Sequence, residues 1–416
     1  MIKTDICIVG AGPGGAAAAL QLGYKGIPCV LIDKATFPRD KICGDALSGK
    51  VTTVLDRMDP QILNRFRGGQ PQEGVWGLKF GVPNQEVLDL NFKSENDAVD
   101  RTAPGYTAKR IDFDNFLIQE TRRHESISLH EGVSIDHYEK TEDGYLLSNK
   151  DKSFQVAAKI LIVANGAYSK FTRHHHGIKK DNRHYAGGIR AYYKNVTGFR
   201  PGNQAIEIHY MKELIPGYLW IFPLANNEAN VGVGMRSDKI SERKFNLTKS
   251  MLDILENHPK FKERFKDAEL IGDIKGFGLP LGSKKRIISG DHYMLVGDAG
   301  HLIDPLTGEG IGNAIYSGVI AADHTEKCLE ANDFSAKFML GYDTRIQRVL
   351  GRELRISYNF QKIMKFPRVV NFMIRCVENN SFVKNFLNEI YADSEMEWQK
   401  HMTSPKFWYK FIFQND

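Results

Sequence analysis

Short, continuous apolar runs that stop at a glycine or an acidic residue mark the start of the chain. Residues 4–9 form one such run, which is followed by a glycine-rich turn and an alanine-rich stretch from Ala16; a second run, residues 29–32, ends on Asp33. Runs of this kind are typical of strands buried on both faces of a parallel sheet, and alanine favours a helix. The pattern therefore predicts a strand, turn, helix and strand in succession.

Two later apolar runs end in a similar way. Residues 159–163 lead to Asn165-Gly166, and residues 293–296 lead to Gly297-Asp298. Both predict strands that return the chain to the first sheet, so the segments between them are at least partly insertions.

The rest of the pattern mixes short strands with helices. Residues 185–236 alternate as short strands, whereas residues 51–66, 245–265 and those beyond Ala322 have helical spacing. A further helix is predicted after Asp112, which we expect to be its N-cap. The glycines of residues 275–281 predict a connector.

The glycine-rich turn has the spacing of a dinucleotide-binding motif. Gly10 allows the tight turn, Gly12 lets backbone N–H groups approach a pyrophosphate, and Gly15 lets the helix pack close to the strand. The positive end of the helix then faces the phosphates. Asp33 follows about 20 residues later, where a carboxylate can bind the hydroxyls of an adenosine ribose.

Composition and charge restrict the class of protein. The 416 residues are 42% apolar and 25% charged with a net charge of +6, as in a globular protein of two or three subdomains. No dense basic stripe with stacking aromatic residues occurs, which argues against nucleic acid as a partner. Five scattered cysteines without CxxC spacing favour a reducing cytoplasm. No apolar run is long enough for a bilayer span, and the early first strand leaves no room for a signal peptide.

The loop of residues 34–49 carries candidate chemistry. Arg39 and Lys41 could meet a pyrophosphate, and Cys43 could lie near a redox ring or be an inert packed thiol. Arg110, just before the helix that follows Asp112, could reach a cofactor or form a surface ion pair.

A second stretch with chemical content follows residues 293–296. Asp298 stands at the carboxyl edge of the predicted strand, where it can bond to polyol hydroxyls. The loop after Pro305 enters a helix through Gly308, Gly310 and Gly312, which exposes N–H donors. Such donors suit an electron-rich ring oxygen or a ring nitrogen that becomes anionic on reduction.

An aromatic stripe is predicted on one strand. Alternation sends Tyr218, Trp220 and Phe222 to the same face, where they form either a wall for an apolar ligand or ordinary sheet core.

Two other features suggest chemistry less strongly. Residues 174–176 are three adjacent histidines, which cannot easily converge on one ion, so we predict an exposed loop and no metal site. The aromatic and basic tail, residues 405–413, could enter a membrane interface, although packing on the body is the preferred interpretation.

Three separated stretches together resemble the FAD-dependent group-A flavoprotein superfamily, which includes aromatic hydroxylases, flavin halogenases and geranylgeranyl reductases. They are the glycine turn, the Asn165-Gly166 strand end and Gly297-Asp298 with its glycine-rich continuation. The resemblance implies an α/β fold, with a Rossmann-type FAD-binding domain, a β-sheet substrate domain and a C-terminal helical region. The implied bounds are 1–73, 101–175 and 276–330 for the FAD-binding domain, 74–100 and 176–275 for the substrate domain, and 331–416 for the helical region.

The geranylgeranyl reductase branch is the part of this superfamily that the chain resembles most. The matching motifs are Lys41-x-Cys43-Gly44 and Tyr218-x-Trp220-x-Phe222-Pro223 with two glycines behind the latter. Enzymes of this branch saturate the double bonds of prenyl chains with reduced flavin. The resemblance implies that Tyr218, Trp220 and Phe222 bind the substrate, and it identifies no catalytic side chain. The residues implied to bind FAD are Gly10, Gly12, Pro13, Gly14, Gly15, Asp33, Lys34, Arg39, Cys43, Gly44, Asp45, Arg110, Gly166, Gly297, Asp298, Pro305, Gly308, Gly310, Ile311, Gly312 and Asn313.

Two positions depart from the superfamily. Asp33 stands where Glu is usual, and Asn165 replaces the acid of an Asp-Gly motif that is linked to NAD(P)H use in the hydroxylases. The electron donor, NAD(P)H or a ferredoxin-like protein, therefore stays open.

The predicted function is an FAD-dependent reductase of a prenyl lipid or other apolar substrate. The first alternative is a flavin-dependent monooxygenase or halogenase acting on an aromatic or polyene substrate. The Tyr-x-Trp-x-Phe-Pro run differs at two positions from the halogenase Trp-x-Trp-x-Ile-Pro pattern, and only a forced alignment makes Lys79 an oxidant-handling lysine. A second alternative is a prenyl-lipid carrier without catalysis. We expect a cytoplasmic protein, either free or peripheral to the inner membrane face.

Overall fold

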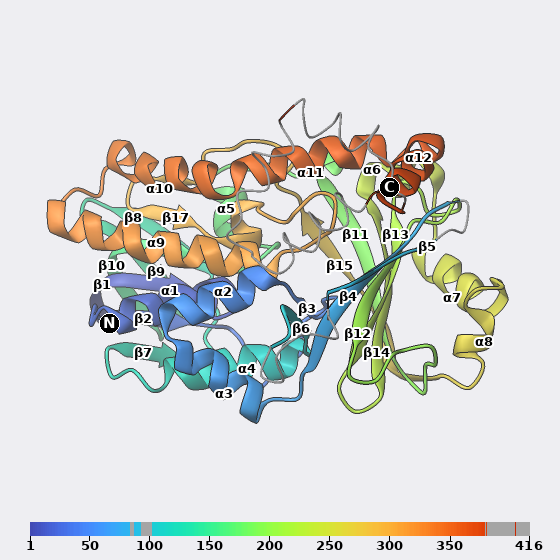
Figure 1. Cartoon of the computed structure of the whole chain (residues 1–416). Coiled ribbons are helices and arrows are strands. Elements are labelled where there is room, and N and C mark those ends of the chain that lie inside the picture. Colours follow the sequence, from blue (N-terminus) through green and yellow to red (C-terminus); the bar gives the residue numbers. More distant parts are fainter. Residues whose placement is uncertain (84–86, 93–101, 379, 381–403, 405–416) are drawn as a thin grey trace.

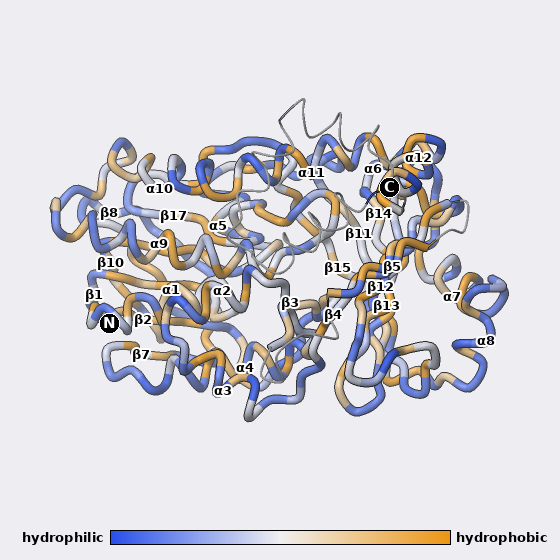
Figure 2. The backbone as a smooth tube through the Cα atoms, in the orientation of Figure 1, coloured by the Kyte–Doolittle hydropathy of each residue, from blue (hydrophilic) through white to orange (hydrophobic). Residues whose placement is uncertain are grey.

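The structure is a computed structural model that describes residues 1–83, 87–92, 102–378, 380 and 404. Two sheets stand side by side, and long helices pack around the first sheet and continue along one edge of the second (Figure 1). The expected α/β class is confirmed. Apolar segments run through the interior of both halves, and polar segments follow the outer turns (Figure 2).

The first sheet is built around the N-terminal strand. Its eight strands are β1 (Ile2–Val9), β2 (Cys29–Ile32), β7 (Ile127–His130), β8 (His137–Thr141), β9 (Gly144–Ser148), β10 (Gln155–Val163), β16 (Ser289–Gly290) and β17 (Tyr293–Leu295). The strands β17, β10, β1, β2 and β7 lie in this order and are parallel. Their carboxyl ends consequently meet at one edge, where Gly10, Asp33, Asn165 and Gly297 follow.

The second sheet is mostly antiparallel. Its nine strands are β3 (Ala46–Leu47), β4 (Glu73–Gly81), β5 (Val87–Asn91), β6 (Gly105–Thr107), β11 (Tyr185–Lys194), β12 (Gln204–His209), β13 (Tyr218–Leu224), β14 (Glu228–Arg236) and β15 (Glu269–Pro280). Leu219 and Ile221 of β13 are fully buried on the face opposite the aromatic stripe, against the helices beyond the sheet. One face of β13 is therefore core, and the other is left for the cavity between the sheets.

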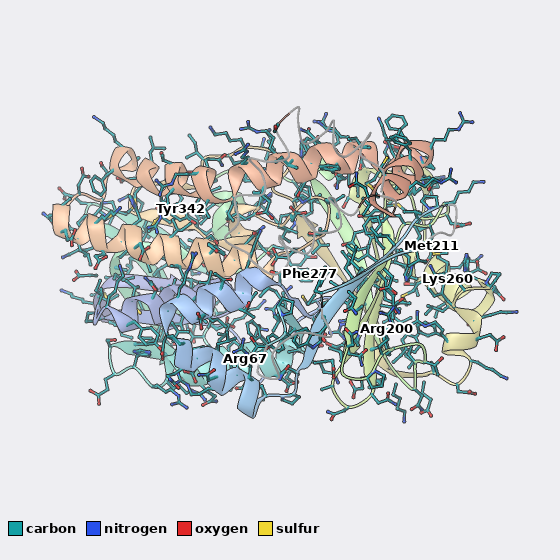
Figure 3. All side chains as sticks on the ribbon, viewed as in Figure 1. Arg67, Arg200, Met211, Lys260, Phe277 and Tyr342 are labelled. Atoms are coloured by element: carbon teal, nitrogen blue, oxygen red, sulfur yellow. The ribbon has the colours of Figure 1, made fainter. Side chains whose placement is uncertain are left out.

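The helices cover both sheets. They are α1 (Pro13–Tyr24), α2 (Gly49–Met58), α3 (Pro60–Gly69), α4 (Arg110–Thr121), α5 (Lys170–His174), α6 (Ser237–Arg243), α7 (Leu247–Asn257), α8 (Lys262–Phe265), α9 (Ile311–Ala331), α10 (Ala336–Val349), α11 (Gly351–Ile363) and α12 (Pro367–Glu378), with 3₁₀ turns η1 (Asn182–His184) and η2 (Gly297–Gly300). Helices α7 and α8 cover the outer face of the second sheet, and α10 to α12 run from one half to the other (Figure 1). Tyr342 of α10 lies in the first half, Lys260 near α8 at the far side of the second, and Phe277 between them (Figure 3).

Two local predictions are wrong. Lys109, not Asp112, is the N-cap of α4, so Asp112 lies in the first turn. Residues 275–280 are the end of β15 and not a connector, because β11 supplies an antiparallel partner that the local glycine and proline signals cannot reveal.

The pairing of the sheets also bears on the implied domains. Strands β3 and β6 come from segments assigned to the FAD-binding domain, yet both pair within the second sheet. The bounds of the domains stay a prediction. The aromatic and basic tail, residues 405–413, lies outside the residues that the structure describes.

Candidate functional site

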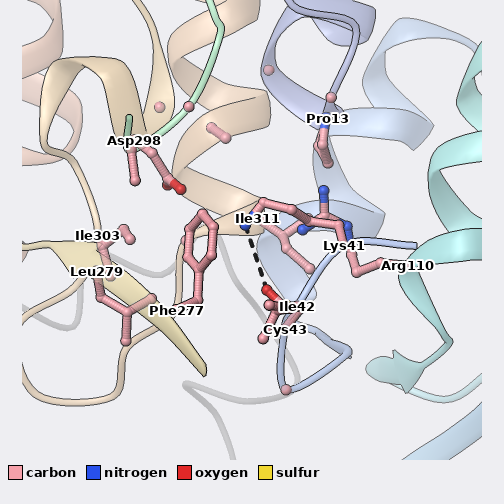
Figure 4. A pocket seen from close by; sticks show the side chains of 18 of the residues that line it. Pro13, Lys41, Ile42, Cys43, Arg110, Phe277, Leu279, Asp298, Ile303 and Ile311 are labelled. Carbon is pink, nitrogen blue, oxygen red and sulfur yellow. Dashed lines mark hydrogen bonds between the residues drawn. The ribbon is translucent and has the colours of Figure 1, made fainter. Parts of the chain in front are cut away.

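A single cavity of about 740 Å³ joins the carboxyl edge of the first sheet to the inner face of the second. This volume is in the range of small-molecule pockets in proteins. Figure 4 shows side chains that line it, contributed by the glycine turn, the loop of residues 34–49, β15 and the start of α9.

The glycine turn lines one end of this cavity, and its geometry requires glycine. Gly10 has φ +102°, and a Cβ there would lie 2.4 Å from the carbonyl oxygen of Ala164. A Cβ on Gly15 would lie 1.8 Å from the carbonyl oxygen of Gly10, so Gly15 permits the close contact of α1 with the turn. Helix α1 begins at Pro13 with Gly12 as N-cap and no capping side chain, which leaves its positive end directed at the cavity.

Asp33 closes the other side of this turn. Its Oδ2 accepts a hydrogen bond of 2.7 Å from the backbone N–H of Ala11, and its Oδ1 accepts one of 2.8 Å from that of Ala35. Each carboxylate oxygen can accept a second hydrogen bond. The buried side chain can therefore hold the turn and also accept a hydrogen bond from a hydroxyl group in the cavity.

Two arginines next to the turn share one buried carboxylate. Arg110 binds Asp114 with both Nε (2.6 Å) and Nη2 (2.7 Å), and Arg39 Nη1 is 2.7 Å from the same carboxylate. A Cβ on Gly12 would lie 3.8 Å from Arg39 Nη2, which places this guanidinium opposite the glycine turn. One carboxylate against two cations leaves a net positive charge where a pyrophosphate would lie. Arg110 thus forms a buried ion pair rather than a surface one.

Lys41, Phe277 and Asp298 meet in the middle of the cavity (Figure 4). The Lys41 Nζ lies 3.3 Å from the centre of the Phe277 ring, and it donates a weak hydrogen bond of 3.4 Å to the Ile42 carbonyl oxygen. Burial lowers the pKa of Lys41, and the nearby Asp298 carboxylate opposes this shift. Burial likewise raises the pKa of Asp298, against the lowering effects of Lys41 and Arg110.

The glycine-rich start of α9 borders the same space. Gly308 has φ +73°, and Gly308, Gly310 and Ile311 line the cavity. Gly312 and Asn313 do not line it, because the Gly312 N–H donates to Glu309 Oε1 at 2.6 Å and Asn313 Nδ2 donates to the Leu302 carbonyl oxygen. The helix start therefore offers fewer free donors than its glycines suggest.

The aromatic stripe lines the opposite end of the cavity. Tyr218, Trp220 and Phe222 share one face of β13, as predicted from alternation. The Trp220 indole lies over glycines of the neighbouring strands: a Cβ on Gly232 would be 2.1 Å from its Cζ2, and one on Gly188 would be 3.8 Å from its Cη2. The Trp220 indole therefore occupies space that is open only because β14 carries glycine there, and a larger residue would displace the ring.

A buried polar network links this wall to the loop of residues 34–49. Trp220 Nε1 donates to Asn230 Oδ1 (2.8 Å), and Asn230 Nδ2 donates to Asp45 Oδ2 (2.8 Å). The Tyr192 hydroxyl donates to the same oxygen at 2.7 Å, whereas Asp45 Oδ1 has no partner. Burial raises the pKa of Asp45 to about 6, although the two donors lower it. At neutral pH this group is therefore mostly ionised, with a minor protonated fraction.

Cys43 lies beside this network and lines the cavity. Burial raises the pKa of its thiol, so the group is protonated and unreactive at neutral pH. The protonated, buried thiol agrees with the inert packed thiol, and its place near a redox ring stays a prediction.

Most residues implied by the resemblance line this one cavity. Those that do not are Gly15, Pro305, Gly312 and Asn313. Whether the remainder bind FAD and substrate stays a prediction.

Several lining residues escaped the sequence analysis. Phe277 and Leu279 belong to the stretch mistaken for a connector, and their alternation was the available signal. Ile206 and Ile208 also alternate on β12. The sequence around Asn230 does not indicate that this residue lies next to the cavity, because its burial depends on partners from other segments.

The three adjacent histidines lie at the end of α5 and directly after it. Among the residues that the structure describes, no cluster of His, Cys, Asp and Glu could hold a metal ion. His174 is exposed, whereas His176 bonds to the Tyr293 hydroxyl and the Ile287 carbonyl oxygen, so the predicted exposed loop is only partly correct.

Comparison with known families decides the class of this site. Residues 3–322, more than three quarters of the chain, match the model of the FAD-binding domain family. The chain belongs to this family. The glycine cradle, the carboxylate beside it and the two arginines that share the Asp114 carboxylate fit the dinucleotide part of FAD, so the flavoprotein's own geometry agrees with the match.

Relatives of this flavoprotein include lipid and quinone reductases. It is 29% identical to a digeranylgeranylglycerophospholipid reductase of Thermoplasma acidophilum over 84% of either chain. It is 25% identical to a menaquinone reductase of Mycolicibacterium smegmatis over 95% of this chain and 94% of the other. A solved geranylgeranyl bacteriochlorophyll reductase-like protein from Thermoplasma acidophilum has a TM-score of 0.79 at 24% identity and covers 95% of this chain and 98% of its own. The predicted resemblance to the geranylgeranyl reductase branch is confirmed.

Proposed function

We propose that this flavoprotein is an FAD-dependent oxidoreductase of geranylgeranyl reductase type, which saturates C=C bonds of a prenyl lipid or similarly apolar substrate. The observation that carries the proposal is the continuity of the cavity. A glycine turn with two arginines lines one end, an aromatic wall lines the other, and Cys43 and Asp45 lie between them. A cofactor at the first end can therefore face a substrate at the second.

The cofactor end suits a charged dinucleotide. Gly12 and the start of α1 would hold the pyrophosphate together with Arg39 and Arg110, while Asp33 would bind the adenosine ribose. Asp298 would bind a polar part of the chain that leads to the ring. When bound and reduced, the flavin would supply a hydride to one alkene carbon.

The opposite end suits an extended apolar chain. Tyr218, Trp220 and Phe222 form its wall, and aliphatic side chains continue the surface; they are Ile189, Ile206, Ile208, Leu78 and Leu279. Each square ångström of apolar surface removed from water there contributes about 25 cal/mol. The wall therefore binds by burial and excludes water from the reacting bond.

Asp45 is the residue best placed to hold the proton that the second alkene carbon needs. Two donors occupy its Oδ2, so a proton on the carboxyl group resides on Oδ1, which has no partner. Its pKa of about 6 keeps a fraction of the group protonated at neutral pH.

One observation weighs against the monooxygenase or halogenase alternative. Leu78 lines the cavity, and Lys79, next to it on β4, does not; the Lys79 Nζ lies 3.5 Å from Glu207, a buried residue of β12. The candidate oxidant-handling lysine is thus engaged away from the cavity. A flavin-dependent brominase shares the fold at a TM-score of 0.69 and 21% identity.

The test is anaerobic turnover with a polyprenyl lipid and dithionite-reduced flavoprotein, followed by mass spectrometry of the product. We expect a mass increase of two hydrogens for each double bond reduced and reoxidation of the flavin absorbance. Lys79→Gln should retain this activity, with Lys79→Arg as its charge-preserving control. An oxygen-dependent, hydroxylated or halogenated product would refute the proposal, and a protein that takes up no FAD would favour the carrier.

The electron donor and location complete the proposal. Parallel assays with NADH, NADPH and a reduced ferredoxin distinguish the two donor classes. In the described part of the chain, no helix is long and apolar enough to cross a membrane. We propose a cytoplasmic protein that reaches its lipid at the inner membrane face, and deletion of residues 405–416 tests whether the tail makes that contact.

A further inference from the structure

A second, smaller cavity lies next to the main one, beyond the end of β15. Its volume is about 140 Å³, and its walls come from residues 282–288, the end of η2, the end of α10 and the first turns of α11. It shares no lining residue with the main cavity. The partition between them is the bridge of Leu281 with Ile303, in which the Gly282 N–H donates to the Ile303 carbonyl oxygen at 2.7 Å.

The charge of this cavity is unusual. Lys284, Lys285, Arg286 and Arg355 line it, and no Asp or Glu does. None of the four forms an ion pair with another residue of the described part of the chain. Arg286 is partly buried, Lys284, Lys285 and Arg355 are exposed, and an anion in the cavity would be attracted by all four.

Arg286 is the most constrained of these cations. It is partly buried, and its Nη1 donates only to backbone carbonyl oxygens, at 2.9 Å to Lys284 and 3.5 Å to Leu281. Burial lowers its pKa, and Asp181, whose charge opposes this effect, is itself bound by Arg183 at 3.0 Å. A partly buried guanidinium without a carboxylate lacks the partner that such groups normally have.

His301 supplies a further unused polar atom. It follows η2 in a left-handed conformation with φ +55°, is 5% exposed, and its Nδ1 has no hydrogen-bond partner. Burial and the neighbouring Arg286 keep its pKa far below the usual range, so it is neutral. A neutral imidazole can donate one hydrogen bond to an anion without adding charge.

We propose that this cavity binds a phosphoryl group. Planar guanidinium groups bind phosphate oxygens in pairs, and lysines complement them as point charges. The volume exceeds the approximately 30 Å³ of a water molecule several times, which suits one phosphate with little water and excludes a whole nucleotide. The phosphoryl group can belong to free phosphate, to the headgroup of a phospholipid or to a nucleotide donor.

The first test measures inorganic phosphate binding to the FAD-loaded full chain by calorimetry at low ionic strength, so that the pyrophosphate end of the main cavity is occupied. We expect saturable one-site binding that weakens at least about tenfold in Arg286→Gln and in Arg355→Gln. Arg173→Gln removes an exposed arginine outside the cavity and should bind as the unmodified protein does. Equal phosphate affinity of all four proteins, or no binding to the unmodified protein, would overturn the proposal.

Further variants guard against misfolding and identify the source of the phosphoryl group. Lys284→Gln with Lys285→Gln changes two exposed residues and should weaken phosphate binding while leaving the melting temperature without phosphate unchanged. If Arg286→Gln raises KM only for a phosphorylated prenyl lipid, the site takes the headgroup; if it raises KM for NADPH but not NADH, it takes the nucleotide. If neither KM changes, the site takes free phosphate. The binding readout requires no turnover and no lipid substrate, so it stands apart from the proposed activity.

Discussion

Replacing Asp45 with asparagine should make the stability of the apoprotein less sensitive to pH between about pH 4 and pH 6. Asp45 is fully buried, and its pKa is raised from 3.8 to about 6, chiefly by burial. The native state therefore binds more protons than the unfolded state between these two values. Stability falls as the pH rises through this interval and is lower by a constant amount above it.

The size of this loss follows from the shift. About two pKa units at 1.36 kcal/mol each give about 3 kcal/mol, lost between about pH 4 and pH 6. Asparagine retains an oxygen for the Tyr192 and Asn230 donors, but its amide would stand where Asp45 Oδ1 has no partner. That unpaired group costs about 1–3 kcal/mol at every pH. The quantity to test is therefore how the difference in free energy of unfolding between Asp45→Asn and the unmodified protein changes with pH, and not the size of that difference at one pH.

The assay is urea unfolding of the apoprotein at several pH values from about 4 to about 7.5, for the unmodified protein and Asp45→Asn. The free energy of unfolding of the variant relative to the unmodified protein should increase by about 3 kcal/mol across this range. Asp56→Asn, at an exposed carboxylate, is the matched control. Tyr192→Phe removes a hydrogen bond that lowers the pKa of Asp45, so it should extend the pH-dependent loss upward. Parallel profiles for Asp45→Asn and the unmodified protein would show that the buried carboxyl does not titrate as argued.

The other predictions concern packing and charge. In Gly232→Ala the new Cβ would overlap the Trp220 ring, so we expect a loss of about 1–3 kcal/mol in urea unfolding and weaker lipid binding, with FAD uptake retained; normal lipid affinity would contradict this. In Gly10→Ala, a Cβ close to the Ala164 carbonyl oxygen at positive φ should abolish FAD uptake, which a flavin absorbance spectrum of the purified protein checks. Asp114→Asn leaves the buried Arg110 and the partly buried Arg39 without their carboxylate and should cost about 3–5 kcal/mol in the apoprotein; a pyrophosphate analogue should restore part of it in thermal melts.

The parts of this structure that the sequence predicts are those governed by local rules. The unit of β1, α1 and β2 follows from apolar runs and from glycines whose absent side chains are a steric requirement. The common face of Tyr218 and Trp220 follows from strand alternation alone. Local rules do not predict strand β15, because Gly276, Gly278 and Pro280 are residue types that disfavour a strand. Pairing with β11 nevertheless holds this segment in the sheet. The role of Asp114 is only partly predictable, since Arg110 lies four residues before it on α4 but its second partner, Arg39, is distant in the sequence.

The loop of residues 34–49 explains why the two ends of the cavity stay aligned. At its start Asp33 binds the glycine turn of the first sheet, and near its end Asp45 accepts hydrogen bonds from Tyr192 and Asn230 of the second. Asn230 also donates to the Cys43 carbonyl oxygen at 2.8 Å and positions Trp220 through its own oxygen. The buried Asp45 carboxyl group, which lowers the stability of the protein at neutral pH, thus also fixes the cofactor end of the cavity relative to the aromatic wall. Since hydride transfer is sensitive to displacements of about an ångström, this stability cost is consistent with a role in alignment as well as in proton supply.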